Sequence, residues 1–160
     1  MLKRVLNIYT KVVIRIITLL MLMLVFSVLL QILGRYVPFI PRYFWTEEVA
    51  NFSLIWTIFL GSIVGVREGK HFFVDFIPNT LADRFATVLK IIYTACLGLV
   101  ALIFIIFGYR FFLMGYIQHS ELTGLNLGTI YISVPFAGLS WVVFLIEDII
   151  EFFKKDRNTS

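Results

Sequence analysis

Four long apolar runs without a single charged residue dominate this 160-residue chain. They cover residues 16–34, 49–66, 91–109 and 122–146. A helix rises about 1.5 Å per residue, so about 20 residues cross a hydrocarbon core of about 30 Å. The runs therefore predict an all-α integral membrane protein with four transmembrane helices.

The composition supports this fold class. The chain is 60% hydrophobic and 15% charged, with a mean hydropathy of +0.93. A soluble fold would need four helices that are apolar on every face, with no polar side for water. The sequence pI is 9.3, but the basic residues gather at the ends of the runs rather than along one stripe. Membrane topology explains that distribution better than a nucleic-acid partner does.

Lysine and arginine are unevenly divided between the two sides of the predicted bundle. With the N-terminus inside, eleven of the fourteen basic residues precede the first run, separate the second from the third, or follow the fourth. Only three lie on the other side. Because cytoplasmic segments carry the excess of Lys and Arg, we expect both termini in the cytoplasm.

We expect a single membrane domain over residues 1–160. Pro135 predicts a kink or a late start in the fourth helix, because proline breaks the backbone hydrogen bonds of a helix interior. The approximate spans are residues 14–35, 47–66, 89–110 and 127–149.

The segment between the second and third runs has its own pattern. It turns at Pro78 and Asn79, and apolar residues at positions 81, 85, 88, 89 and 92 then recur at helical spacing. This spacing predicts an amphipathic cytoplasmic lead-in to the third helix, at the inner membrane surface.

The predicted spans lack the residues that chemistry or ion coupling would need. Transporters and pumps usually carry intramembrane Asp, Glu, Lys, Arg or His, and these runs have none. The two histidines, His71 and His119, fall on opposite membrane faces and cannot share a metal or a haem. We therefore expect no catalytic residue, no metal and no cofactor in this chain.

The short segment 36–48 combines aromatic and acidic residues. Trp45 suits the headgroup level, where its ring keeps one edge wet. Thr46 can cap the second helix, with Glu47 and Glu48 at the positive end of its dipole. The acidic pair is therefore interpreted either as helix capping or as a polar contact to a partner.

Small residues recur every four positions along the second run. Gly61 and Gly65 form a small-xxx-small pair, which lets another helix approach closely. That helix could belong to this chain or to a partner. Trp56 lies elsewhere on the same helix, where it suits lipid or a partner groove.

Residues 35–75 together resemble a known family, the DctQ-like small membrane subunits of tripartite ATP-independent periplasmic (TRAP) transporters. The pattern is an arginine closing the first helix, a tryptophan–acid–acid entry to the second, an aromatic-Leu-Gly, and then Arg-x-Gly-x-His with a nearby Asp. The residues that carry it, with neighbouring interface candidates, are Arg35, Trp45, Glu47, Glu48, Trp56, Gly61, Gly65, Arg67, His71 and Asp75.

The resemblance implies a non-enzymatic accessory role in a bacterial inner (cytoplasmic) membrane. A periplasmic binding protein (DctP-like) would deliver an organic acid, such as a C4-dicarboxylate or a sialic acid, to a large multispanning subunit (DctM-like). The sodium and substrate sites would belong to that large subunit. This chain would dock on it within the lipid, through its first two helices and segment 67–77.

Other interpretations stay open at this point. Arg67, His71 and Asp75 could contact the large subunit or form a local arrangement at the lipid headgroups. The chain could also be an autonomous small transporter that works as an oligomer, or an accessory subunit of another membrane complex. A membrane enzyme or redox subunit is disfavoured, because no base is available within the spans to activate a nucleophile.

Overall fold

The computed structural model describes residues 2–37, 39, 41, 43–76, 83–120 and 123–157. Over these residues the chain is all-helical, without strands, and an isolated bridge pairs His119 with Asn126. The helices are α1 (Leu2–Tyr36), α2 (Trp45–Phe76), α3 (Asp83–Ile117), the single turn α4 (Gly128–Tyr131) and α5 (Ser133–Arg157).

Four helical stretches are long and apolar enough to cross a membrane, as the sequence predicts. They are Arg4–Tyr36, Trp45–Gly69, Ile91–Ile117 and Gly128–Ile150. The last combines α4 with the first part of α5. Ile132 separates these two helices, and Pro135 falls in the first turn of α5, where proline is tolerated. Pro135 therefore accompanies a late start of α5.

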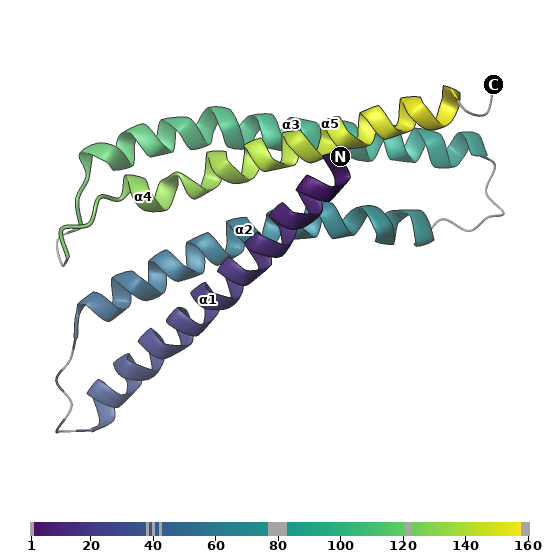
Figure 1. Ribbon diagram of the computed structural model, residues 1–160. Coiled ribbons are helices and arrows are strands. Elements are labelled where there is room, and N and C mark those ends of the chain that lie inside the picture. The colour runs from purple at the N-terminus through teal and green to yellow at the C-terminus, as the bar shows by residue number, and fades with distance from the viewer. Residues whose placement is uncertain are drawn as a thin grey trace.

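The helices form two antiparallel pairs, α1 with α2 and α3 with α5, which diverge toward one end of the bundle (Figure 1). The described ends of the chain lie at the opposite end, together with the end of α2 and the start of α3. Both termini therefore lie on the same side of the bundle. The side of the membrane that they face stays a prediction.

The α1–α2 pair is built on a seven-residue repeat. Every seventh residue of α1 is buried: Leu6, Val13, Leu20, Ser27 and Gly34. A repeat of seven keeps one seam of a helix facing its partner in a left-handed supercoil. The buried residues of α2, which packs on both α1 and α5, are Thr46, Ala50, Ser53, Leu60, Ile63 and Val66.

The α3–α5 pair uses the same spacing but smaller residues. Ala101, Gly108 and Gly115 are buried at intervals of seven along α3. A Cβ added to Gly108 would lie 2.8 Å from the backbone nitrogen of Pro135, and one added to Gly138 would lie 3.0 Å from the Ala101 carbonyl oxygen. Lipid is as apolar as leucine, so close packing is a main source of attraction between membrane helices. In this pair, the glycines allow the close packing of α3 on α5.

The segment for which the sequence predicts an amphipathic lead-in contains the end of α2 and the start of α3. α2 continues to Phe76, and α3 is one continuous helix from Asp83. Residues 77–82, which include the predicted turn at Pro78 and Asn79, lie outside the described residues. The amphipathic character of the lead-in, the single-domain assignment and the predicted span limits stay predictions.

Candidate functional site

The most polar group of contacts inside the bundle surrounds Arg67 of α2. Its Nη1 donates to Glu147 Oε2 of α5 at 2.8 Å, and its Nη2 donates to Asn7 Oδ1 of α1 at 2.7 Å. The arginine side chain is 15% exposed and the glutamate side chain 6%. One guanidinium therefore connects three helices and ties the α1–α2 pair to the α3–α5 pair.

An aromatic layer lies beside this ion pair. The Arg67 guanidinium carbon is 5.0 Å from the centre of the Phe144 ring, within the range of a cation–π contact. Tyr9 meets Phe144 edge to face at 6.2 Å, and its hydroxyl lies 2.7 Å from Ser140 Oγ. Since Ser140 donates its own hydrogen to the Phe136 carbonyl, Tyr9 is the donor to Ser140. We call Asn7, Tyr9, Arg67, Ser140, Phe144 and Glu147 the Arg67 cluster.

The sequence did not identify Glu147, the first charged residue after the fourth uncharged run, as a candidate. The signal that could have found it is its place on the packed face of α5. Ala137, Ser140 and Phe144 are buried at helical spacing, and Glu147 continues that face. Arg67 and Glu147 are also the first charged residues beyond two uncharged runs, so both lie at the same depth.

Glu147 carries an oxygen that the cluster does not use. Its Oε1 is buried and has no hydrogen-bond partner in the described part of the chain. A buried ion pair often adds little net stability, yet removal of one partner costs about 3–5 kcal/mol. We therefore interpret the Arg67 cluster as a device that fixes how the two helix pairs are oriented.

The acidic pair at the start of α2 divides between two environments. Glu47 is exposed, whereas Glu48 accepts a hydrogen bond from the Thr123 hydroxyl in the segment between α3 and α4. Glu48 therefore makes a contact inside this chain. Thr46 is the second residue of α2, and its hydroxyl donates to the Tyr43 carbonyl at 2.6 Å. The expected cap is wrong, because α2 already begins at Trp45 and Thr46 therefore lies inside the helix.

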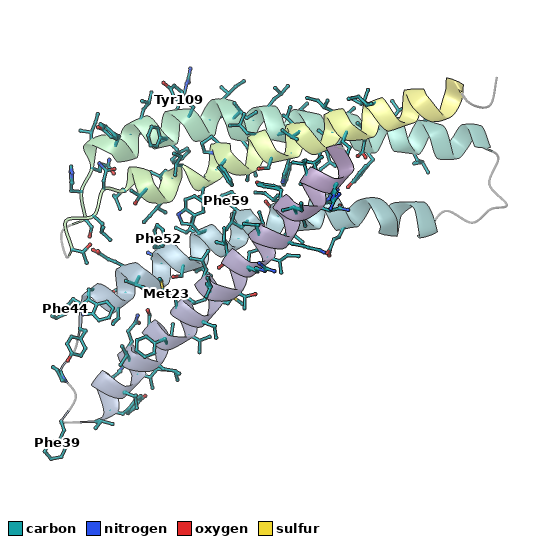
Figure 2. The ribbon with its side chains drawn as sticks, in the orientation of Figure 1. Met23, Phe39, Phe44, Phe52, Phe59 and Tyr109 are labelled. Atoms are coloured by element: carbon teal, nitrogen blue, oxygen red, sulfur yellow. The ribbon has the colours of Figure 1, made fainter. Side chains whose placement is uncertain are left out.

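The two tryptophans lie differently. Trp45 is 44% exposed, and its ring packs against Tyr43 at 6.0 Å. Trp56 instead donates from Nε1 to the Thr129 carbonyl at 3.1 Å and contacts Phe136 at 6.2 Å. About one turn further along α2, Phe59 lies between the two helix pairs, with its ring 5.9 Å from the ring of Phe104 in α3 (Figure 2). Trp56 therefore joins α2 to the α4–α5 segment.

The glycine pair of α2 has no helix packed on it. Nothing lies within 4 Å of a Cβ added to Gly61 or to Gly65. Among the described residues, no other helix of this chain makes the predicted close approach. The positions that do receive such an approach are Gly108, Gly115 and Gly138 in the α3–α5 pair.

The remaining candidates lie at the two ends of the bundle. Arg35, at the end of α1, lines a pocket with Tyr43 and Glu47. His71 and Asp75 belong to the last part of α2, but their side chains lie outside the described residues. The structure brings Arg35 and Glu47 to one pocket and places Arg67 apart from both.

The contacts above connect the helices of the bundle to one another. Over the residues with described positions, no three His, Cys, Asp or Glu side chains lie together as a metal site would require. The absence of a cofactor stays a prediction. The fold defines a multi-pass helical membrane protein whose polar side chains hold its helices together.

Comparison with known proteins places the chain in a family. Residues 24–155 match the family described as "Tripartite ATP-independent periplasmic transporters, DctQ component". The chain therefore belongs to the DctQ family of TRAP transporter small permease components, as the resemblance in residues 35–75 predicted.

Two curated relatives come from Haemophilus influenzae. The "Sialic acid TRAP transporter permease protein SiaT" of strain 86-028NP is 30% identical over 116 residues, which is 69% of this chain but 18% of SiaT. The "Putative TRAP transporter small permease protein" of strain Rd is 23% identical over 114 residues, covering 71% of this chain and 68% of the relative. This chain thus spans less than a fifth of SiaT.

Proposed function

We propose that this chain is the non-catalytic small transmembrane subunit of a TRAP-type secondary transporter. It docks on a large multispanning subunit and stabilises it in the membrane. The large subunit carries out sodium-coupled uptake of an organic acid that a periplasmic binding protein delivers. This chain has no catalytic residue, metal or cofactor of its own. It spans a bacterial inner membrane with both termini in the cytoplasm.

The observation that carries the proposal is the uncovered glycine pair of α2. Small-xxx-small pairs allow a second helix to approach closely, and no helix of this chain occupies the space beside Gly61 and Gly65. The opposite side of α2 is already packed on α1 and α5. A helix of a partner can therefore reach the glycine side without displacing any described contact.

The α1 helix supports the same surface. In its membrane-spanning window only 6% of the residues are buried, against 39% in the window of α4 and α5. Exposed leucine, isoleucine and valine side chains follow α1 over its whole length. We propose that α1 and α2, with segment 67–77, form the docking surface and that lipid covers the rest.

The relatives support a partner of this kind. SiaT is a far longer permease chain, and this chain matches 18% of it. A segment like this one is therefore joined to a much larger remainder in that protein. The similarity to SiaT, a sialic acid TRAP transporter permease protein, favours a sialic acid over a C4-dicarboxylate as the organic acid.

The test is purification of the tagged full chain from its native membranes in mild detergent, with mass spectrometry of the proteins that accompany it. We expect a large multispanning subunit in a fixed molar ratio, absent from a mock purification without the tag. Recovery of the chain alone, or only with itself, would favour an autonomous oligomeric transporter. A large partner of another class would identify an accessory subunit of a different complex.

A second measurement separates the autonomous transporter from the accessory subunit. Liposomes that contain only this chain should take up no sialic acid or C4-dicarboxylate above protein-free liposomes, because the four spans offer no coupling group at mid-membrane. Uptake by the chain alone would overturn the proposal.

A further inference from the structure

A pocket opens between the end of α1 and the start of α2, at the end of the bundle opposite the termini. Its volume is about 580 Å³, within the range of about 300–1,000 Å³ typical of small-molecule sites. Phe44, one of its lining residues, is labelled in Figure 2 where α1 and α2 are joined. The lining residues are Leu30, Gln31, Ile32, Arg35, Tyr36, Tyr43, Phe44, Thr46 and Glu47.

Among the described residues that line the pocket, one side chain is positive and one is negative. Arg35 lies in the last turn of α1 and Glu47 in the first turn of α2, and both are exposed. Neither forms an ion pair with any residue that the structure describes, including each other. Within the described part of the chain, both charges can therefore pair with a ligand that carries a positive and a negative group.

The position of the pocket restricts which ligand can reach it. Arg35 is next to the last residue of the membrane-spanning stretch Arg4–Tyr36, so it lies at the level of lipid headgroups. Tyr36 and Tyr43 suit that level, where an aromatic ring keeps a polar edge in water. Ile32 and Leu30 lie about one turn and one and a half turns deeper along α1 than Arg35, and they provide an apolar wall.

We propose that this pocket binds a phospholipid with a zwitterionic phosphoethanolamine headgroup, from the leaflet opposite the termini. Arg35 binds the phosphate, since the planar guanidinium matches phosphate oxygens with two parallel hydrogen bonds. The Glu47 carboxylate accepts hydrogen bonds from the primary ammonium. The acyl chains descend along the wall formed by Leu30 and Ile32.

The charges favour this headgroup over the two common alternatives. An anionic glycerol headgroup would meet Arg35 but leave Glu47 unpaired beside a negative ligand. A choline headgroup has a quaternary ammonium with no N–H to donate to the carboxylate. Only the primary ammonium satisfies both side chains, so we expect a preference for phosphatidylethanolamine.

The test is native mass spectrometry of the purified full chain, with any partner that accompanies it, after delipidation. Phosphatidylethanolamine, phosphatidylglycerol and phosphatidylcholine of identical acyl chains are titrated separately. We expect the unaltered protein to bind phosphatidylethanolamine most tightly, by about tenfold over the other two lipids. Equal binding of the three lipids, or a preference for the anionic lipid, would overturn the proposal.

Two variants assign the two ends of the headgroup. Arg35→Gln should weaken phosphatidylethanolamine binding about tenfold. Glu47→Gln should abolish the preference over phosphatidylglycerol while phosphate binding persists. The matched control is Arg110→Gln, an exposed arginine near the same end of the bundle but outside the pocket, which should change neither.

Circular dichroism shows whether each variant keeps its helical content. If a variant fails to fold, the headgroup series on the unaltered protein still decides the proposal. Lipid binding that is unchanged in Arg35→Gln would overturn it. If that variant instead loses capture of a soluble periplasmic binding protein, the pocket belongs to a protein contact.

Discussion

Glycines of the two helix pairs have different surroundings. In the α3–α5 pair, Gly108, Gly115 and Gly138 face a neighbouring helix so closely that an added Cβ would collide with it. In the α1–α2 pair, Gly61 and Gly65 face open space. Internal packing therefore accounts for Gly108, Gly115 and Gly138, whereas no described neighbour accounts for Gly61 and Gly65.

The Arg67 cluster is what keeps these two pairs together at the end that carries the termini. At the other end the pairs diverge (Figure 1), and the hydrogen bonds Glu48–Thr123 and Trp56–Thr129 connect them. The bundle thus joins two pairs by polar contacts at both of its ends.

The largest expected effect comes from breaking the connection between the pairs. Glu147→Ala leaves the buried Arg67 guanidinium without its carboxylate, which should lower the free energy of unfolding by about 3–5 kcal/mol. Thermal or denaturant unfolding in detergent, followed by circular dichroism, measures this change. Glu68→Ala, which removes an exposed glutamate of α2, should have almost no effect.

A double variant sharpens this result. Replacing both charges with apolar residues, Arg67→Met with Glu147→Leu, should recover most of the lost stability, because no unpaired charge remains. Equal destabilisation by Glu147→Ala and Glu68→Ala would contradict the role given to the cluster.

The next effect tests the packed glycines. Gly108→Ala places a methyl group 2.8 Å from the Pro135 backbone, which cannot move without shifting α5, so we expect a loss of about 1–3 kcal/mol. Gly98→Ala on the same helix meets only the end of the Leu145 side chain at 3.9 Å and should be neutral or slightly stabilising. The same unfolding measurement compares them, and similar values for both variants would show that α3 and α5 are not in close contact.

A smaller effect is expected at the diverging end. Thr123→Val removes the hydroxyl that donates to Glu48 and should cost at most about 1 kcal/mol, since both groups are exposed. Faster hydrogen exchange of amides in residues 123–131 would report the local loosening. Thr18→Val, whose hydroxyl bonds only within α1, is the control and should leave that exchange unchanged.

Much of this molecule follows from patterns along the sequence. The uncharged runs predict the four membrane-capable helices, and the motif in residues 35–75 predicts the family. The seven-residue spacing of Leu6, Val13 and Leu20 was also available in the sequence as a pairing signal. Hydropathy alone identifies a membrane span, because whether a segment can span the membrane depends on the composition of that segment and not on its neighbours.

The pairing of helices could not be predicted in the same way. Which glycine receives a neighbour depends on the relative rotation of two helices, and every glycine looks equivalent in a single run. Glu147 could not be recognised as part of a cluster, because its partner, Arg67, is 80 residues away along the sequence. Long-range contacts of this kind are set by packing, which a single sequence does not display.

The uncovered face of α2 is tested most directly by Gly61→Leu combined with Gly65→Leu. The measurement is the molar ratio of the large subunit to the tagged chain after purification from native membranes. Because no described atom lies within 4 Å of either Cβ position, we expect stability to stay within about 0.5 kcal/mol of the unaltered chain. The control is Ala95→Leu, which enlarges an exposed small residue of α3 and should keep the normal ratio. A folded double variant that loses most of its large subunit is the predicted result, and one that retains the full ratio would contradict docking through this face.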